Sequence, residues 1–181
     1  MDEGQHVWYF AYGSNLSADV FRGRRGIAWR RALPARLSGW RLVFDKPPII
    51  PIGESFANLI EDAAADALGV LYEIGAPDLE HVELTEGVPM GNYRRIEVEA
   101  APLDANPAGW VVTAHTLVSE RRDPELCPSH RYMELVIAGA IAHNLPHEHI
   151  TALRAVPSRP STPEAIEFRQ RIDGLMRNLR R

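Results

Sequence analysis

The sequence predicts an α+β fold in which about six or seven short strands close into a small barrel and helices follow. Strand patterns occupy most of the chain as far as residue 117, and helical patterns occupy the rest. This segregation is typical of α+β proteins, because strands and helices alternate in βαβ sheets. Closing short strands into a barrel removes their exposed edges. A chain of 181 residues fits one domain with a helical appendage.

The chain opens with a predicted strand, a glycine turn and a short helix. Residues 7–12 (VWYFAY) form a continuous aromatic and β-branched run, which indicates a buried strand. Gly13-Ser14-Asn15 ends this strand. Apolar residues at helical spacing then predict a helix over residues 16–25.

The middle of the chain carries four predicted strands, over residues 32–37, 40–44, 56–60 and 67–74. Ser38-Gly39 has the chemistry of a hairpin turn, so we expect the first two strands to form a hairpin. An acidic turn at Glu61-Asp62 is expected to join the last two. Residues 46–53 are rich in proline and predict a loop.

A short helix and a strand pair are expected next. Pro77-Asp78 begins the helix, since Pro suits a first helical turn and Asp suits its positive end. The helix runs to about Glu86, and Gly87 ends it. Residues 93–101 alternate apolar and charged side chains, which predicts a strand with one solvated face, paired with residues 110–117.

Helices dominate the C-terminal part of the chain, over residues 129–143, 146–155 and 163–180. A proline-rich linker, residues 157–163, separates the last two. We therefore expect one domain over residues 1–155. Residues 156–181 are expected to form a linker and a helix that packs on this domain or at a contact in a homodimer.

Composition argues against several classes of function. The formal net charge of −4 and a pI near 6.0 disfavour nucleic-acid binding, which needs concentrated Lys and Arg. A local basic cluster is interpreted as a solvated helix end and loop: Arg22, Arg24, Arg25, Arg30 and Arg31. The N-terminus lacks a signal-peptide pattern, and no apolar run approaches the ~18 residues of a membrane span. With Cys127 as the only cysteine, we expect a cytoplasmic protein without a membrane partner.

Two local features are candidates for chemistry. Glycine in the turn Tyr12-Gly13-Ser14-Asn15 lets the backbone approach a ligand, and its N–H groups can hold a carboxylate or an oxyanion. Glu86 lies at the negative end of a helix dipole, which suits a proton shuttle. Taken alone, each also fits a plain alternative: many Gly-Ser turns are only turns, and many such glutamates lie on the surface.

Six segments in a fixed order resemble the γ-glutamylcyclotransferase family over roughly residues 8–155. They are YFAYGSNL (9–16), ARLSGWRLVF (35–44), ANLI (57–60), LGVLYE (68–73), EGV with GNY (86–93), and PSHRY with GAIAHNLP (128–146). The resemblance implies a small mixed β-barrel flanked by helices. It also implies a γ-glutamyl substrate that attacks itself through its α-amine and releases 5-oxoproline, with no metal and no cofactor.

The resemblance also implies roles for particular residues. Glu86 corresponds to the family's catalytic glutamate. The expected substrate-binding residues are Tyr12, Gly13, Ser14, Asn15, Tyr93 and Tyr132. Two positions depart from the family pattern: Glu83 replaces a common Asp, and Asn144 replaces a glycine that ends a helix. Neither departure affects the proposed chemistry. At the end of the helix, Asn tolerates the left-handed conformation as glycine does.

Three alternatives remain open at this point. A non-catalytic module on the same fold would bind γ-glutamyl or other small carboxylate ligands. A metal site is suggested by the cluster of His143, His147, Glu148 and His149, although Pro146 interrupts the helix and the order is not HExxH. A nucleophilic hydrolase would need Cys127 with His130, or Ser14, but Ser14 does not lie in a G-x-S-x-G elbow. The leaving group of the γ-glutamyl substrate is not determined.

Overall fold

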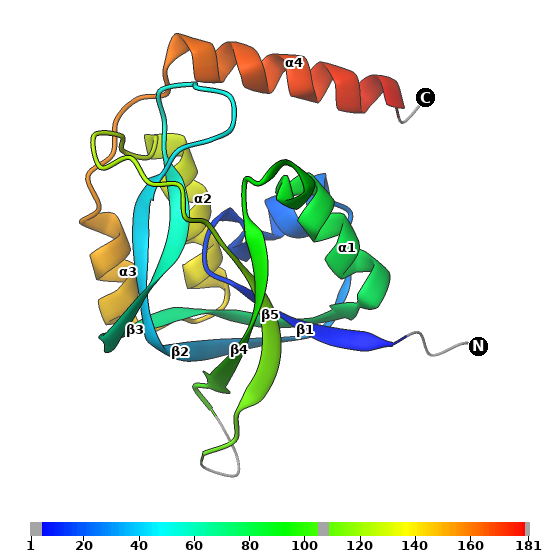
Figure 1. The fold of residues 1–181 in the computed structure, drawn as a ribbon, viewed down its shortest axis with the longest axis vertical. Helices are drawn as coiled ribbons and strands as arrows, with labels where there is room; N and C mark the ends of the chain where they lie inside the picture. The colour runs from blue at the N-terminus through cyan, green and yellow to red at the C-terminus, as the bar shows by residue number, and fades with distance from the viewer. Residues whose placement is uncertain (1–4, 105–108, 180–181) are drawn as a thin grey trace.

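The computed structural model describes residues 5–104 and 109–179, and the side chains of the last helix as far as Arg171. Its strands are β1 (His6–Ala11), β2 (Trp29–Lys46), β3 (Phe56–Gly75), β4 (Arg94–Pro102) and β5 (Val112–Val118). They close into a barrel in the order β1-β3-β2-β4-β5 (Figure 1). β1 and β5 meet in parallel at Tyr9 and His115, and the other pairs are antiparallel. The predicted mixed barrel is therefore confirmed.

The described barrel has five strands rather than six or seven, because two predicted turns lie inside long strands. Ser38-Gly39 belongs to β2, and Glu61-Asp62 belongs to β3. The two strands pair along most of their length, with a register shift between Ser38 and Trp40. Gly39 has a φ of 81°, a conformation that serves a bulge as well as a hairpin turn. The proline-rich segment 47–55 makes the connection between the strands instead.

β1 is buried on both sides, which explains its continuous apolar run. Tyr9 and Ala11 pack into the cluster that lies under the helices, where Phe21 stacks on Tyr9 at 5.7 Å between ring centroids. Phe10 and Tyr12 face the other way, into the second cluster inside the barrel. Successive strand residues point to opposite faces, so both faces require apolar side chains here.

Two short turns replace the helix expected over residues 16–25. They are the 3₁₀ turn η1 (Ser14–Leu16) and the π-helical turn η2 (Asp19–Arg24). The turn η1 packs directly on α2 (His130–Ala142), since a Cβ on Gly139 would lie 2.4 Å from the Leu16 carbonyl carbon. The glycine turn after β1 is therefore held in place by its packing against α2.

The remaining helices follow the predicted order. α1 (Ala76–Thr85) ends as expected, because Gly87 takes a φ of 76° and leads into the 3₁₀ turn η3 (Val88–Met90). After α2 come α3 (His147–Arg154) and α4 (Pro163–Leu179). Asn144 takes a φ of 54°, so asparagine does adopt the left-handed conformation at the end of α2. No helix within the described residues is long and apolar enough to cross a membrane.

The start of α4 lies beside the loop between β2 and β3 (Figure 1). Arg169 pairs with the buried carboxylate of Glu54 at 3.5 Å. Thr162 donates its hydroxyl to the carbonyl of Ile52, and its own N–H donates to Glu54 at 3.3 Å. These contacts join the first turns of α4 to the segment 47–55.

Candidate active site

A cavity of about 860 Å³ opens where the ends of β1, β2 and α1 meet α2 and α4. All the site residues expected from the sequence line it: Tyr12, Gly13, Ser14, Asn15, Glu86, Tyr93 and Tyr132. They come from segments up to 120 positions apart, from Tyr12 to Tyr132. The tertiary structure thus brings the two local candidates, the glycine turn and Glu86, into one site.

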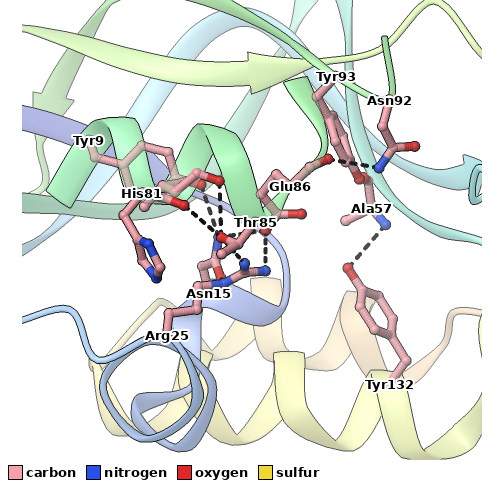
Figure 2. A network of polar contacts seen from close by, with 11 residues as sticks. Tyr9, Asn15, Arg25, Ala57, His81, Thr85, Glu86, Asn92, Tyr93 and Tyr132 are labelled. Carbon is pink, nitrogen blue, oxygen red and sulfur yellow. Dashed lines mark hydrogen bonds and ion pairs between the residues drawn. The ribbon is translucent and has the colours of Figure 1, made fainter. Parts of the chain in front are cut away.

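The carboxylate of Glu86 points toward the glycine turn. Its Oε1 accepts a hydrogen bond from Asn15 Nδ2 at 3.0 Å and one from Arg25 Nη2 at 2.5 Å (Figure 2). The side chain is 20% exposed, so it is neither sealed nor free in solvent. Its Oε2 has no partner within the described part of the chain and is not closed off. One oxygen is therefore anchored while the other remains available to a ligand.

Local backbone geometry sets the position of Glu86. The residue directly follows α1, and Gly87 turns the chain away with its positive φ. Asn92 Nδ2 donates to the Glu86 carbonyl at 2.8 Å and fastens the turn. A Cβ on Gly87 would lie 3.0 Å from the Asn92 Cβ, so this close turn requires glycine.

Arg25 joins the glycine turn to the end of α1. Its Nε donates to Asn15 Oδ1 at 2.8 Å, its Nη1 donates to the hydroxyl of Thr85, and its Nη2 pairs with Glu86. Only 15% of its side chain is exposed. The prediction that the basic cluster is a solvated helix end and loop is therefore wrong for Arg25. The planar guanidinium presents its N–H donors in a rigid fork that reaches three separate acceptors, whereas an ammonium group is a compact point charge.

Two tyrosines of the cavity, Tyr93 and Tyr132, are hydrogen-bonded to the backbone of Ala57 in β3. Tyr93 donates its hydroxyl to the Ala57 carbonyl at 3.0 Å, and the Ala57 N–H donates to the Tyr132 hydroxyl at 3.1 Å. Burial raises the pKa of Tyr132 to about 12, so its phenol stays neutral. A Cβ on Gly13 would lie 3.0 Å from that hydroxyl and 3.1 Å from the Ala57 Cβ. Tyr12 donates to the carbonyl of Leu117, so its hydroxyl is already occupied.

Lys46 is a second residue that the sequence did not reveal. It was expected to begin a loop, but it is the buried last residue of β2. Its Nζ lies 4.2 Å from the centroid of the Tyr93 ring and donates to Asn92 Oδ1. Burial lowers the pKa of Lys46 to about 8, the charge of Glu86 opposes this shift, and the charge of Arg121 adds to it.

Positive charge predominates in the cavity, in contrast to the net charge of −4 on the whole chain. The lining includes five cationic residues, which are Arg24, Arg25, Lys46, Arg131 and Arg169. Among the described residues of the lining, the acidic ones are Glu54 and Glu86, and each pairs with an arginine. Such a site attracts ligands that carry carboxylates.

The candidate residues for a metal site or a nucleophile do not all line the cavity. His143 is half-buried, contacts the Tyr72 hydroxyl at 2.7 Å and does not line the cavity. No three His, Cys, Asp or Glu side chains gather as metal ligands in the part of the chain that the structure describes. Cys127 and His130 do not line the cavity, whereas Ser14 does.

Comparison with known proteins gives consistent matches. Residues 66–153 match the model of the AIG2-like family. The chain is 31% identical over 170 residues to a gamma-glutamyl cyclotransferase of Aspergillus oryzae, covering 84% of this chain and 62% of that protein. It is 26% identical to the gamma-glutamylcyclotransferase of Bos taurus, covering 85% of this chain and 80% of that protein. The chain thus spans about three fifths of the fungal relative.

Solved structures show the same fold. The structure of a gamma-glutamyl cyclotransferase superposes with a TM-score of 0.75 at 23% identity, covering 92% of this chain and 99% of that one. An uncharacterized protein from Homo sapiens superposes with a TM-score of 0.74 at 24% identity, covering 90% and 97%. At these identities the likeness establishes the small mixed barrel with its flanking helices.

Proposed function

We propose that the chain, which is similar to gamma-glutamylcyclotransferases over most of its length, converts γ-glutamyl amides into 5-oxoproline and a free amine or amino acid. Glu86 serves as the general acid and base. The observation that carries this proposal is the position of the Glu86 carboxylate, which lies 3.0 Å from Asn15 of the glycine turn inside a cavity. A surface glutamate would have no reason to be aimed at this turn.

The reaction moves two protons away from the α-amine of the substrate, one before the attack and one after it. The α-amine of the substrate, with an ordinary pKa of ~7.7–8.0, is mostly protonated at neutral pH and must lose a proton before it attacks. Glu86 Oε2 accepts this proton. The amine nitrogen then bonds to the γ-carbonyl carbon of the same molecule, which closes a five-membered ring. The amide C–N bond breaks as Glu86 gives this proton to the departing nitrogen. The Glu86 carboxylate then accepts the second proton, which the ring nitrogen loses as it becomes the amide of 5-oxoproline, and passes it to the released amine.

The glycine turn supplies groups that hold charge during this step. The N–H groups of Gly13 and Asn15 have no acceptor among the described residues, so they are available to a ligand. They can receive the substrate carboxylate or the oxyanion that develops on the γ-carbonyl oxygen. The cationic lining draws a substrate that always carries at least one carboxylate.

Orientation supplies most of the expected acceleration. Holding the amine against its own carbonyl is worth up to ~7–11 kcal/mol of the barrier. Proton transfer by Glu86 adds about 10²–10⁴-fold. Tyr93 and Tyr132, both hydrogen-bonded to the backbone of Ala57, serve to fold the glutamyl group into its reactive shape.

Mass-spectrometric detection of 5-oxoproline from a panel of γ-glutamyl compounds tests the proposal. We expect Glu86→Gln to lower kcat at least ~100-fold and to leave ligand binding nearly intact. Glu83→Gln is the matched control, since this glutamate lies on α1 three positions before Glu86, does not line the cavity and pairs with Arg95. Full activity of Glu86→Gln would remove Glu86 from the mechanism. Tight binding of γ-glutamyl compounds without 5-oxoproline would favour a binding module.

A further inference from the structure

An apolar wall extends the cavity beyond Glu86. It consists of Ile49, Ile50, Ile52, Met90 and Phe168, which all line the cavity. Three separate segments supply it: the loop 47–55, the turn η3 and the helix α4. The side of the cavity that carries the glycine turn and the tyrosines is thus continued by a surface of a different chemical character.

Several side chains of this wall are exposed to an unusual degree. Ile49 is 39% exposed, Ile50 is 52% exposed and Met90 is 70% exposed. Large apolar side chains scattered singly on a surface need no explanation, but several that line one cavity indicate a binding surface. The exposed members come from two segments, so their meeting is a property of the fold rather than of one apolar stretch of sequence.

The wall begins next to Gly87, the residue that follows Glu86. A Cβ built on Gly87 would lie 3.4 Å from Ile49 Cδ1 and 3.4 Å from Met90 Cε. Gly87 directly follows Glu86, so these two side chains lie beside the turn that carries the proposed acid and base, and they line the same cavity as its carboxylate. A substituent on the departing nitrogen would therefore meet the wall.

The wall is also fixed in place. Arg169 and Glu54 hold the start of α4 against the loop 47–55, and Thr162 binds the carbonyl of Ile52. The volume of about 860 Å³ lies in the upper part of the ~300–1,000 Å³ range for sites that take drug-sized ligands. A glutamyl group would fill only the portion beside the tyrosines, which leaves the portion along the wall for the leaving group.

We infer that the preferred substrates are γ-glutamyl conjugates of amines or amino acids with a large apolar side chain, aromatic or branched aliphatic. This inference rests on the proposed cyclisation and specifies its leaving group. The Glu86 side of the cavity binds the γ-glutamyl half, and the apolar wall contacts the side chain of the departing amine. Removing that side chain from water favours binding in proportion to its apolar area.

A four-member panel tests the inference with the full chain: γ-glutamylphenylalanine, γ-glutamylleucine, γ-glutamylalanine and γ-glutamylglycine. We expect kcat/KM for 5-oxoproline release to be at least ~10-fold higher for the phenylalanine conjugate than for the glycine conjugate, with leucine near phenylalanine. Equal values, or a preference for glycine, would overturn the inference while leaving the proposed function intact. Release of 5-oxoproline from other γ-glutamyl compounds but from none of these four would also overturn the inference alone, and release from no γ-glutamyl compound would overturn both.

Variants of the wall give a second measurement. Ile50→Ser and Met90→Ser change exposed side chains, so folding should tolerate them. Each should lower the phenylalanine-to-glycine ratio of kcat/KM by at least ~3-fold. Ile141→Ser is the matched control, because this isoleucine is 47% exposed on α2 and lies outside the cavity. An unchanged ratio in both wall variants, or an equal change in the control, would refute the role of the wall.

Discussion

Replacing Arg25 tests whether the guanidinium positions the proposed acid and base. Arg25→Gln removes the charge and at least two of three contacts, which reach Glu86, Asn15 and Thr85. The variant keeps a side chain of related shape, so the turn η2 should still form. Glu86 would then lose one of the two donors that hold its Oε1, and its carboxylate could turn away from the glycine turn.

The size of the effect follows from the environment of the pair. Exposed ion pairs contribute ~0.2–1 kcal/mol, and breaking a fully buried pair costs ~3–5 kcal/mol. The side chains here are 15% and 20% exposed and the N–O distance is 2.5 Å, which places the pair between these limits. About 2 kcal/mol of lost positioning corresponds to a ~30-fold decrease in kcat. KM should change much less, because Arg25 acts through Glu86.

Steady-state kinetics of 5-oxoproline release, together with thermal unfolding, measures this outcome. Arg25→Lys should recover part of kcat, since an ammonium group can pair with Glu86 but lacks the rigid fork of donors that also reaches Asn15 and Thr85. Arg30→Gln is the matched control, an exposed arginine of the same basic cluster outside the cavity. The reasoning is refuted if Arg25→Gln retains full kcat, or if its loss is matched by Arg30→Gln.

Three further predictions concern packing and charge. Gly13→Ala should lower activity at least ~10-fold and stability by ~1–3 kcal/mol, because its Cβ would lie 3.0 Å from the Tyr132 hydroxyl; wild-type kinetics and urea midpoints would contradict this. Gly139→Ala should cost more than ~2 kcal/mol, since its Cβ would lie 2.4 Å from the Leu16 backbone, and an unshifted urea midpoint would rule this contact out. Lys46 has its pKa lowered from 10.5 to about 8, so the unfolded chain binds its proton more tightly. Burial of the ammonium should therefore lower the free energy of unfolding by up to ~3 kcal/mol below pH 8, and this penalty should disappear as the pH rises toward 10.5. Urea unfolding of wild type and Lys46→Met at pH 7 and 10 measures it, and parallel pH profiles would disprove the assignment.

The β2–β3 pair shows why local patterns mislead about strand number. Ser38-Gly39 favours a break in regular pairing, and the structure does place a register shift there. A positive φ at Gly39 suits both a hairpin turn and a bulge, so the dipeptide alone does not distinguish them. Which one forms depends on whether β3 continues alongside β2, and that is a property of the closed barrel.

Local chemistry in the sequence determined the glycine turn, the end of α1 at Glu86, the left-handed Asn144 and the alternating faces of β4. Each of these depends on backbone conformation or side-chain alternation within a few residues. The tertiary structure alone decided that Arg25 would meet Glu86, 61 positions away, and that Lys46 would be buried beside Asn92. An exposed and a buried arginine look alike in sequence, because burial and pairing arise only when distant segments pack together.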